Sequence, residues 1–499
     1  MRSTRAYPCL VCVILWMGMS GAVTSAQVPP VGEVEAPPAA VTSEVPPESA
    51  EERPTEDEIF GDVSTSDLDE ESSSSSAEDG ATTGLELVDD MLTIGGQLYL
   101  RFDMSILDDQ AFGEQALAMP NLLDIYLDAR PDPRLRAFVN GRLRYDPTVT
   151  DGEVDVAGQP IEPATVMLDQ LWIKTDIERL VFFTIGQQRV KWGACRVWNP
   201  TDFVNKSRRD PLTFFDERTG LPMIKLHVPF EDLGWNLYAL MLFDGVDSLK
   251  DVGGAFRLEM VLGPAELSLS AVVGANRKTS FGLDISAGVG DVDVFAEVAI
   301  SDEHGSNDYV VDSGAAEALA DEGLTDAQFF QILTDSVAIE RRAEWGVRVG
   351  GGLEWSFRVG DDDTMVLGAE YFYNGLGESE PLAYPLMLFN GDFEALYVGE
   401  HYGAFFWLYP SPGSLDEATI MFTTLGNFSD LTMVSRVGFS VSFHRRLRLE
   451  SYVQVHYGFD DDQGELRYEM HVPEIPDVSP QLDIRAPRAS VGLNLRVAL

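Results

Sequence analysis

The chain has 499 residues and a formal net charge of −47 at pH 7, with 35 Lys and Arg residues against 82 Asp and Glu residues. A protein of this sign repels phosphate groups, which argues against nucleic-acid binding by charge neutralisation. The length fits about three ordinary domains or one large architecture.

Residues 1–26 predict a secretory signal peptide. A basic start is followed by the apolar run Cys9–Met19 and by small residues before Gln27. The run is too short to span a bilayer, so we expect it to be cleaved rather than to act as an anchor. Cleavage would leave Cys195 as the only cysteine, which predicts an inert thiol and no disulfide within the chain.

Residues 27–90 have a different composition from the rest of the chain. They hold nineteen acidic residues against one basic residue, together with paired prolines and the run Ser72–Ser76. Such a segment buries too little apolar surface to offset the entropy of ordering it. We expect a disordered acidic Pro/Ser-rich periplasmic linker, with a docking tail as the alternative.

From Met91 onward the dominant hydrophobic period is two, which is typical of β-strands with one apolar and one polar face. In the segment 446–459, for example, Leu447, Leu449 and Val453 alternate with polar residues. Alternation and turn residues together predict an all-β chain of about 16 to 18 antiparallel strands. The expected strands are 92–103, 121–130, 135–146, 165–177, 180–190, 222–230, 233–243, 252–262, 265–275, 279–289, 291–301, 342–358, 363–374, 400–409, 417–427, 431–443, 446–459 and 486–498.

The connections between these strands alternate in length. After even-numbered strands they are mostly tight turns, and after odd-numbered strands several are long. Bacterial outer-membrane barrels have this arrangement, with short periplasmic turns, long extracellular loops and an even strand number, whereas a soluble β-sandwich has no reason to keep its long loops at one end. Residues 91–499 are therefore predicted to form a transmembrane antiparallel β-barrel. The long connections are 104–120, 147–164, 191–221, 302–341, 375–399 and 460–485.

Two tryptophans give a geometric test of the barrel. Trp345 and Trp355 lie on the same face of one expected strand. At a rise of ~3.3 Å per residue and a tilt of ~40°, they are separated by roughly 25 Å along the membrane normal. This is the spacing of the two aromatic girdles of an outer-membrane barrel, and the alternative is a pair of sandwich-core tryptophans.

Two stretches resemble known proteins. The C-terminal SVGLNLRVAL resembles the terminal recognition strand of outer-membrane barrels, with Leu499 in place of the usual aromatic residue. A second stretch resembles a pattern of large porin-like outer-membrane proteins, a group that includes substrate-selective porins and exporters of acidic polysaccharide. Its matching residues are Gly186, Gln188, Trp192, Gly193, Asn199, Pro200 and Asp202. The resemblance implies a channel in the outer membrane of a Gram-negative-type bacterium and does not fix the substrate.

In such a barrel the polar strand faces line the lumen. Basic residues gather on one arc and acidic residues on the opposite arc, which would favour passage of anions. The alternative is that these charges pair with each other and hold the strands or a plug together. The basic wall candidates are Arg136, Arg142, Arg144, Lys174, Lys225, Arg448 and Arg496, and the acidic ones are Glu259, Glu266, Asp293, Glu297, Glu354 and Glu370.

The loop 191–221 is the third long connection and is unusually basic for this chain, with six Lys or Arg residues against four Asp or Glu residues. In general porins the third loop folds into the barrel, and we expect the same here, with turns at Asn199-Pro200 and Asp210-Pro211. Its aromatic residues either form a surface for sugar rings or anchor the loop to the wall. The expected constriction and selectivity residues are Lys191, Arg196, Asp202, Arg208, Arg209 and Arg218.

The predicted function is passive passage of small polar, anionic solutes through an outer-membrane channel narrowed by loop 191–221. The alternative is a non-conducting barrel that acts in adhesion, surface binding or envelope assembly. The six histidines show no zinc spacing and no Gly-x-Ser-x-Gly motif occurs, so we expect no enzyme, catalytic residue, metal or cofactor. Expected partners are the outer-membrane lipid bilayer, a small-molecule solute, the barrel assembly machinery and a second copy of the chain. The apolar spacing within 302–341 also predicts a short helix, which either caps the barrel or lies on its surface.

Overall fold

The computed structural model describes residues 91–107, 110–150, 160–274, 277–312, 326–360, 363–444, 446–459, 464–472 and 482–499. The predictions for the signal peptide 1–26 and the acidic segment 27–90 lie outside these residues.

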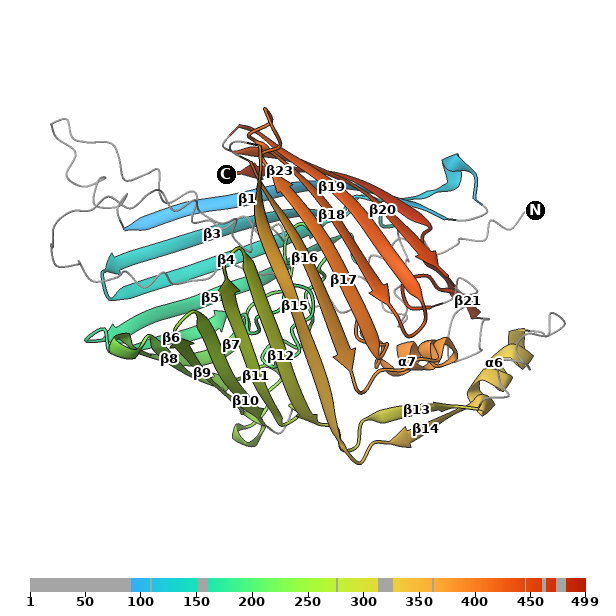
Figure 1. Cartoon of the computed structure of the whole chain (residues 1–499), viewed down its shortest axis with the longest axis horizontal. Coiled ribbons are helices and arrows are strands. Elements are labelled where there is room, and N and C mark those ends of the chain that lie inside the picture. The colour runs from blue at the N-terminus through green and yellow to red at the C-terminus, as the bar shows by residue number, and fades with distance from the viewer. Residues whose placement is uncertain are drawn as a thin grey trace.

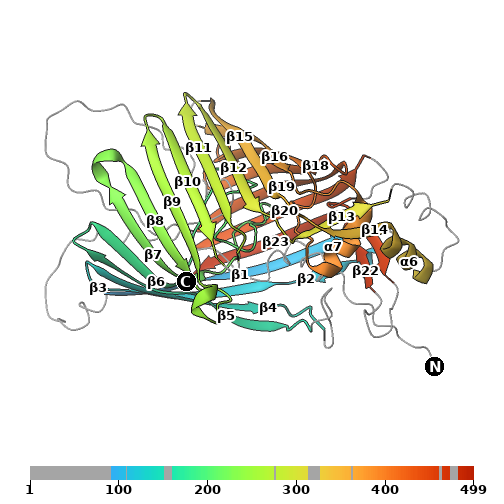
Figure 2. The same ribbon diagram turned by 90° about the horizontal axis from the view of Figure 1, so that it is seen from below.

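The described chain forms a closed antiparallel β-barrel in which strands pair in chain order (Figures 1 and 2). The barrel closes where β1 pairs with the last strand, β23, from Gln97↔Ala498 to Ile106↔Ala489. The main sheet has 19 strands, one of which is the short β2 (Ala116–Ala118) beside β1, so the wall consists of eighteen. Each strand predicted from the sequence is present within three residues at either end. The wall strands are β1 (Leu92–Ile106), β3 (Asn121–Asp132), β4 (Leu135–Tyr145), β5 (Ala164–Ile177), β6 (Val181–Gln188), β7 (Leu221–Phe230), β8 (Trp235–Leu242), β9 (Gly253–Leu262), β10 (Ala265–Val273), β11 (Ser280–Val289), β12 (Val292–Asp302), β15 (Trp345–Val359), β16 (Asp363–Asn374), β17 (His401–Pro410), β18 (Ala418–Asn427), β19 (Thr432–His444), β20 (Leu447–Gly458) and β23 (Ala489–Ala498).

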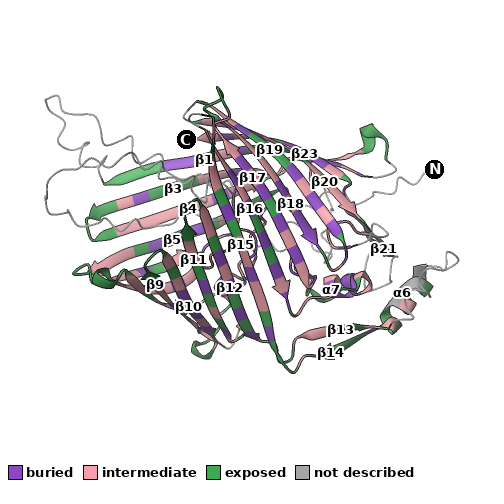
Figure 3. Ribbon diagram, in the orientation of Figure 1, coloured by how far each residue is buried: buried purple, intermediate pink, exposed green. Residues whose placement is uncertain are grey.

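The two faces of the wall differ in polarity, and exposed and buried positions alternate along the strands (Figure 3). On β15, Leu353 and Trp355 are 47% and 44% exposed, whereas Glu354 between them is 5% exposed. Buried polar residues face inward on most strands. A soluble protein buries its apolar residues and exposes its polar ones, so this barrel has the reverse arrangement.

A bulge shifts the inside–outside alternation on β5. The register between β4 and β5 changes between Asn140 and Gly141, so both Asp169 and Gln170 are buried. Asp169 there accepts a hydrogen bond from Asn140 Nδ2 at 2.8 Å. Strict alternation could not predict two consecutive inward side chains, because a bulge adds one residue to a single strand.

The long connections contain elements of their own beyond one end of the barrel (Figures 1 and 2). The helix predicted within 302–341 is confirmed as α6 (Asp326–Ser336). It lies in the chain between β13 (Asn307–Val311) and β14 (Val337–Arg341), which pair with each other and which the sequence did not reveal. Also not predicted were α7 (Tyr384–Asn390) and the pair β21 (Glu469–Val472) and β22 (Leu482–Arg485). In the described residues no helix has both the length and the apolar character needed to cross a membrane.

Candidate functional site

Residues 189–220, between β6 and β7, form the segment that we name the inner loop. Its backbone is held by carboxylates on strands far from β6 in the wall. The N–H groups of Ala194 and Cys195 donate to Glu297 on β12 at 2.5 and 2.7 Å. Glu370 on β16 accepts from the next three N–H groups, those of Arg196, Val197 and Trp198, at 2.8, 3.1 and 2.7 Å. The inner loop therefore runs from β6 across the interior to the wall of β12 and β16.

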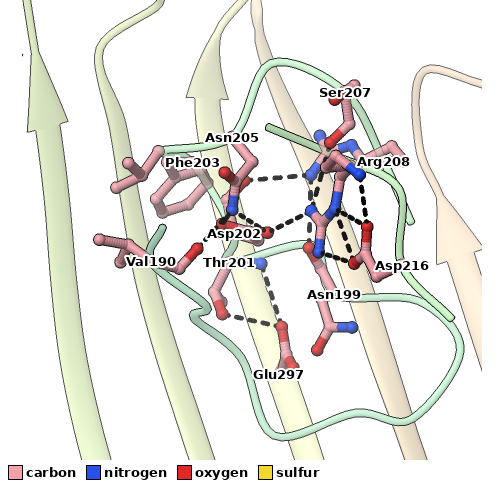
Figure 4. Close-up of polar contacts among 12 residues, drawn as sticks. Val190, Asn199, Thr201, Asp202, Phe203, Asn205, Ser207, Arg208, Asp216 and Glu297 are labelled. Carbon is pink, nitrogen blue, oxygen red and sulfur yellow. Dashed lines mark hydrogen bonds and ion pairs between the residues drawn. The ribbon is translucent and has the colours of Figure 1, made fainter. Parts of the chain in front are cut away.

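Turns expected from the sequence shape this loop. Asp202 N donates to Asn199 O at 3.1 Å, and Thr213 N donates to Asp210 O at 3.3 Å. In each turn the proline occupies the second position, where its fixed φ is favourable. The first turn brings Thr201 onto Glu297, which accepts from its N–H at 3.0 Å and from its hydroxyl at 2.8 Å (Figure 4).

Aromatic side chains of the inner loop are anchors. Trp198 is fully buried, stacks on Phe372 with ring centroids 5.7 Å apart, and donates from its indole N–H to Leu396 O at 2.9 Å. Trp192 and Phe215 are also buried. Since these three rings are covered by the wall and by other loops, they offer no face on which a sugar could slide.

Glycines allow the loop and the wall to approach closely. Gly193 has φ 105°, and a Cβ there would lie 2.6 Å from Glu297 Oε1. On the facing strand β15, a Cβ at Gly350 would lie 3.1 Å from Cys195 Sγ. Only residues without a side chain fit these contacts without a shift. Cys195 itself is buried, and burial together with Glu370 and Glu297 raises the pKa of its thiol, as expected for an inert cysteine.

On the opposite side of the barrel, Glu217 of the inner loop contacts arginines of β1 and β4. Its carboxylate accepts from Arg101 Nη1 at 2.5 Å and from Arg144 Nη2 at 2.9 Å, and its backbone carbonyl accepts from Arg142 Nη1 at 3.0 Å. Burial alone would raise the pKa of Glu217, but Arg101, Arg144 and Arg142 hold it below its ordinary value. Sequence reasoning missed Glu217, although an acidic residue in a loop expected beside a basic wall was an available signal.

The structure places the residues predicted to form the constriction in and around the inner loop. Lys191, Asp202, Arg208, Arg209 and Arg218 line one small cavity, together with Trp192, Val197, Asn199 and Tyr397. The sixth predicted residue, Arg196, lies apart from them and pairs with Glu354 on β15 at 3.0 Å.

Several cations of that cavity are held by carboxylates. Arg208 contacts Glu394 at 3.2 Å, and Arg218 contacts Asp216 at 2.7 Å and Asp202 at 3.2 Å. Burial alone would lower the pKa of Arg218, but the two aspartates more than offset it and raise the pKa. These ion pairs therefore help to fix the fold of the loop, in line with the alternative that the interior charges pair with each other.

The predicted basic wall residues divide into two groups. The arginines make ion pairs, whereas Lys174 and Lys225 make no ion pair with any described residue. The arginine pairs are Arg136–Asp128 at 2.8 Å, Arg142–Asp124 at 2.6 Å, Arg144–Glu217 at 2.9 Å, Arg448–Glu450 at 3.8 Å and Arg496–Glu450 at 2.7 Å. The two tryptophans predicted to lie in the girdles, Trp345 and Trp355, are both partly exposed on the outward face of β15.

At the long-loop end, Glu465 joins a loop to the rims of two strands. It accepts from Tyr402 Oη at 2.5 Å, from Asn427 Nδ2 at 3.0 Å and from Leu396 N, and its own N–H donates to Asp430 at 2.7 Å. Burial, followed by the nearby Asp430, raises the pKa of Glu465 to about 8.

This shift predicts that rising pH loosens the segment 464–468. In an open or unfolded segment Glu465 would titrate near 4.3, so the closed segment holds a proton that the open one releases. The contribution of this proton to the stability of the closed segment is fully present below about pH 4.3. It falls as the pH rises toward about 8 and is lost above that pH. Amide hydrogen exchange, normalised for its intrinsic pH dependence, should accelerate in this segment by up to about tenfold per pH unit. Glu465→Gln should remove that dependence, and equal protection of the wild-type segment at low and neutral pH would contradict the prediction.

Among the described residues, no group of three or more His, Cys, Asp or Glu side chains is arranged to hold a metal ion.

No protein-family model and no curated sequence matches the chain. Solved structures that resemble the barrel include OccAB1 of Acinetobacter baumannii, at 8% identity and a TM-score of 0.47, over 82% of this chain and 96% of that one. A mutant of the porin of Rhodopseudomonas blastica matches at 11% identity with a TM-score of 0.38, over 82% of this chain and 100% of that one. The outer membrane protein OmpT of Vibrio cholerae matches at 8% identity with a TM-score of 0.37, over 82% of this chain and 100% of that one.

Proposed function

We propose that this protein is a porin-like channel in the outer membrane of a Gram-negative-type bacterium, through which small polar and preferentially anionic solutes pass passively. The observation that carries the proposal is the closed eighteen-strand barrel with a polar interior and an apolar exterior. Barrels of about 16 to 18 strands enclose an aqueous channel when their interior is polar. The apolar exterior would contact lipid, with Trp345 and Trp355 at the two interfaces.

The inner loop is the candidate constriction. It is tied to Glu297 and Glu370 on one side of the barrel and to arginines of β1 and β4 on the other. A segment fixed at both sides reduces the cross-section available to a solute, and its position is set by buried hydrogen bonds that are costly to leave unmade.

Anion preference is supported by how the interior carboxylates are used. Glu297 and Glu370 accept hydrogen bonds from the inner loop, and Glu217 is neutralised by arginines. Lys174 and Lys225 form no ion pair with any described residue, although the carboxylate of Asp176 interacts electrostatically with Lys174. The residual potential of the wall they occupy is therefore positive.

The rival proposal is a non-conducting barrel for adhesion or envelope assembly, and the dense contacts of the inner loop are the observation that favours it. Planar-bilayer recording of the refolded mature chain separates the two. We expect discrete single-channel steps, and a reversal potential in a KCl gradient that is displaced toward the chloride equilibrium potential. No current in any salt would exclude the channel, and a displacement toward potassium would exclude anion preference. Recovery of the protein from outer-membrane fractions, with heat-modifiable gel migration, tests the location.

A further inference from the structure

We propose that the acidic segment 27–90 binds the short-turn rim of its own barrel beside β1 and there restricts the entry of anionic solutes. The short-turn rim is the end of the barrel at which the tight turns between wall strands lie. The proposal rests on the proposed function and adds its regulation, because the segment would act as an intramolecular inhibitor of the channel.

The turns of this rim form a basic arc and an acidic arc. In the sequence, the turns β19–β20, β3–β4 and β5–β6 are RR, PR and ERL, with four arginines against one acidic residue. The turns β7–β8, β9–β10, β11–β12, β15–β16 and β17–β18 are EDLG, GP, GD, GDD and SPGSLDE, with seven acidic residues and no Lys or Arg. An acidic peptide is therefore attracted to one arc and repelled by the other.

The acidic segment is attached within the basic arc. It ends at Met91, whose carbonyl oxygen accepts from Arg130 N at 2.8 Å. On one side of β1 lie β3 and β4 with their PR turn (Figure 1). On the other side lies β23, where Ala498 N donates to Arg446 O of the RR turn at 3.0 Å. The chain therefore enters β1 between two turns that carry arginines.

Three exposed arginines of these turns, Arg134, Arg179 and Arg446, form a surface that we name the basic rim. They make no ion pair with any described residue. Asp132 and Asp176, at the adjoining strand ends, accept from the backbone N–H groups of Arg134 and Arg179 at 2.9 and 2.7 Å instead. Since a guanidinium presents several N–H donors in one plane, each side chain of the basic rim can bind a further carboxylate.

The acidic segment has the charge and the length to reach the basic rim. It holds nineteen acidic residues against one basic residue, and Glu78, Asp79, Glu86, Asp89 and Asp90 lie within thirteen residues of Met91. Twelve residues span up to ~40 Å. β6 is the fourth wall strand from β1, which is a distance of ~19 Å at a strand spacing of about 4.8 Å. Carboxylates close to the attachment point therefore reach all three arginines.

The tether decides whether such contacts form. One exposed ion pair between separate molecules is weak. A short tether holds the carboxylates at a local concentration in the millimolar range, and many of them can exchange at the same arginines. Docked at the entrance, their surplus negative charge repels anionic solutes. Because the Debye length falls from about 10 Å at 0.1 M to about 3 Å at 1 M, salt should release the segment.

Fluorescence anisotropy of a dye on Ser76→Cys, in the refolded full-length mature chain, tests docking independently of conductance. Cys195 is buried, so the new thiol takes the label. We expect a high anisotropy at low salt and a lower one in ~1 M KCl. The charge-reversed variant Arg134→Glu/Arg446→Glu should give the lower value at low salt as well. Both arginines are exposed, and heat-modifiable gel migration checks that the variant folds.

Lys250→Glu is the matched control, because it reverses an exposed charge in η3 (Leu249–Asp251) at the opposite end of the barrel and should keep the low-salt anisotropy. An anisotropy that does not respond to salt, or that stays high in the charge-reversed variant, would overturn the docking. A value that falls when the protein is diluted at constant salt would assign the segment to a second copy of the chain, and would also overturn the proposal.

Inhibition is tested by removing the segment from the folded protein. A site-specific protease sequence in place of residues 80–85 removes no acidic residue and can be cut after refolding. We expect cleavage and a salt wash to raise the single-channel conductance and the anion preference at low salt, and to change neither in ~1 M KCl. Docking without any conductance would overturn the channel and leave the docking. Conductance that neither cleavage nor the charge-reversed variant changes would overturn the inhibition and leave the channel.

Discussion

Replacing Glu297 and Glu370 together with alanine is expected to release the inner loop from the far wall and to raise the single-channel conductance by about twofold or more. The two carboxylates accept from the backbone of Ala194, Cys195, Thr201 and the three residues from 196 to 198. Each buried N–H that loses its acceptor costs about 1–3 kcal/mol unless water reaches it. The loop can recover this cost only by moving away from the wall into solvent.

Glu266→Ala is the matched control for this double variant. Glu266 lies on the same inward face of the barrel, on β10, but makes no contact with the inner loop among the described residues. The Glu266→Ala variant loses one interior negative charge but no acceptor of an inner-loop N–H group, so its conductance should stay near the wild-type value. A double variant with wild-type conductance would show that the other contacts of the loop hold it in place without these two carboxylates.

Replacing Glu217 with glutamine is expected to shift the channel further toward anions. Arg101 and Arg144 would keep a hydrogen-bonding partner of the same size but lose its charge. A unit charge acts on a monovalent ion ~7 Å away in water with roughly 0.6 kcal/mol, which is about threefold for each ion and, because the sign is opposite for anions and cations, about sevenfold in the anion-to-cation permeability ratio. The reversal potential in a salt gradient measures this ratio.

The same change should lower stability, because the partly buried Arg101 and Arg144 would lose their counter-charge, at a cost of up to about 3 kcal/mol. Urea unfolding of the refolded protein would measure this cost. Glu344→Gln serves as the control, since Glu344 is exposed in a connection outside the barrel interior. An unchanged reversal potential in the Glu217 variant would show that the ion path does not pass along the wall of β1 and β4.

The strands were predictable because each carries its own signal. Alternation of apolar and polar residues and the tight turns between strands are local properties, and they placed all eighteen wall strands. Local signals do not predict a bulge, such as the one at Asp169 and Gln170, because a bulge depends on the register with the neighbouring strand. The pairing of β13 with β14 was not predicted for a similar reason, since both strands are short and a long insertion separates them in the chain.

The position of the inner loop was inferred from its order along the chain, but its contacts were not predictable. Trp198 meets Glu370, which is 172 residues away in the sequence, and Thr201 meets Glu297, which is 96 residues away. Glu297 and Glu370 were predicted as interior acids, and nothing in their neighbourhoods indicated that they would accept backbone N–H groups.

The central claim, that the inner loop crosses the barrel and lies against β15, can be tested with one engineered cysteine. A Cβ at position 350 would lie 3.1 Å from Cys195 Sγ. In a disulfide, a Cβ lies about 3 Å from the partner's sulfur. Gly350→Cys in the mature chain should therefore form an intramolecular disulfide on mild oxidation, detected as a loss of two hydrogens by mass spectrometry and as faster migration on a non-reducing gel. Gly351→Cys, on the outward face of the same strand, should keep both thiols. Two free thiols in the Gly350 variant after oxidation would contradict the account.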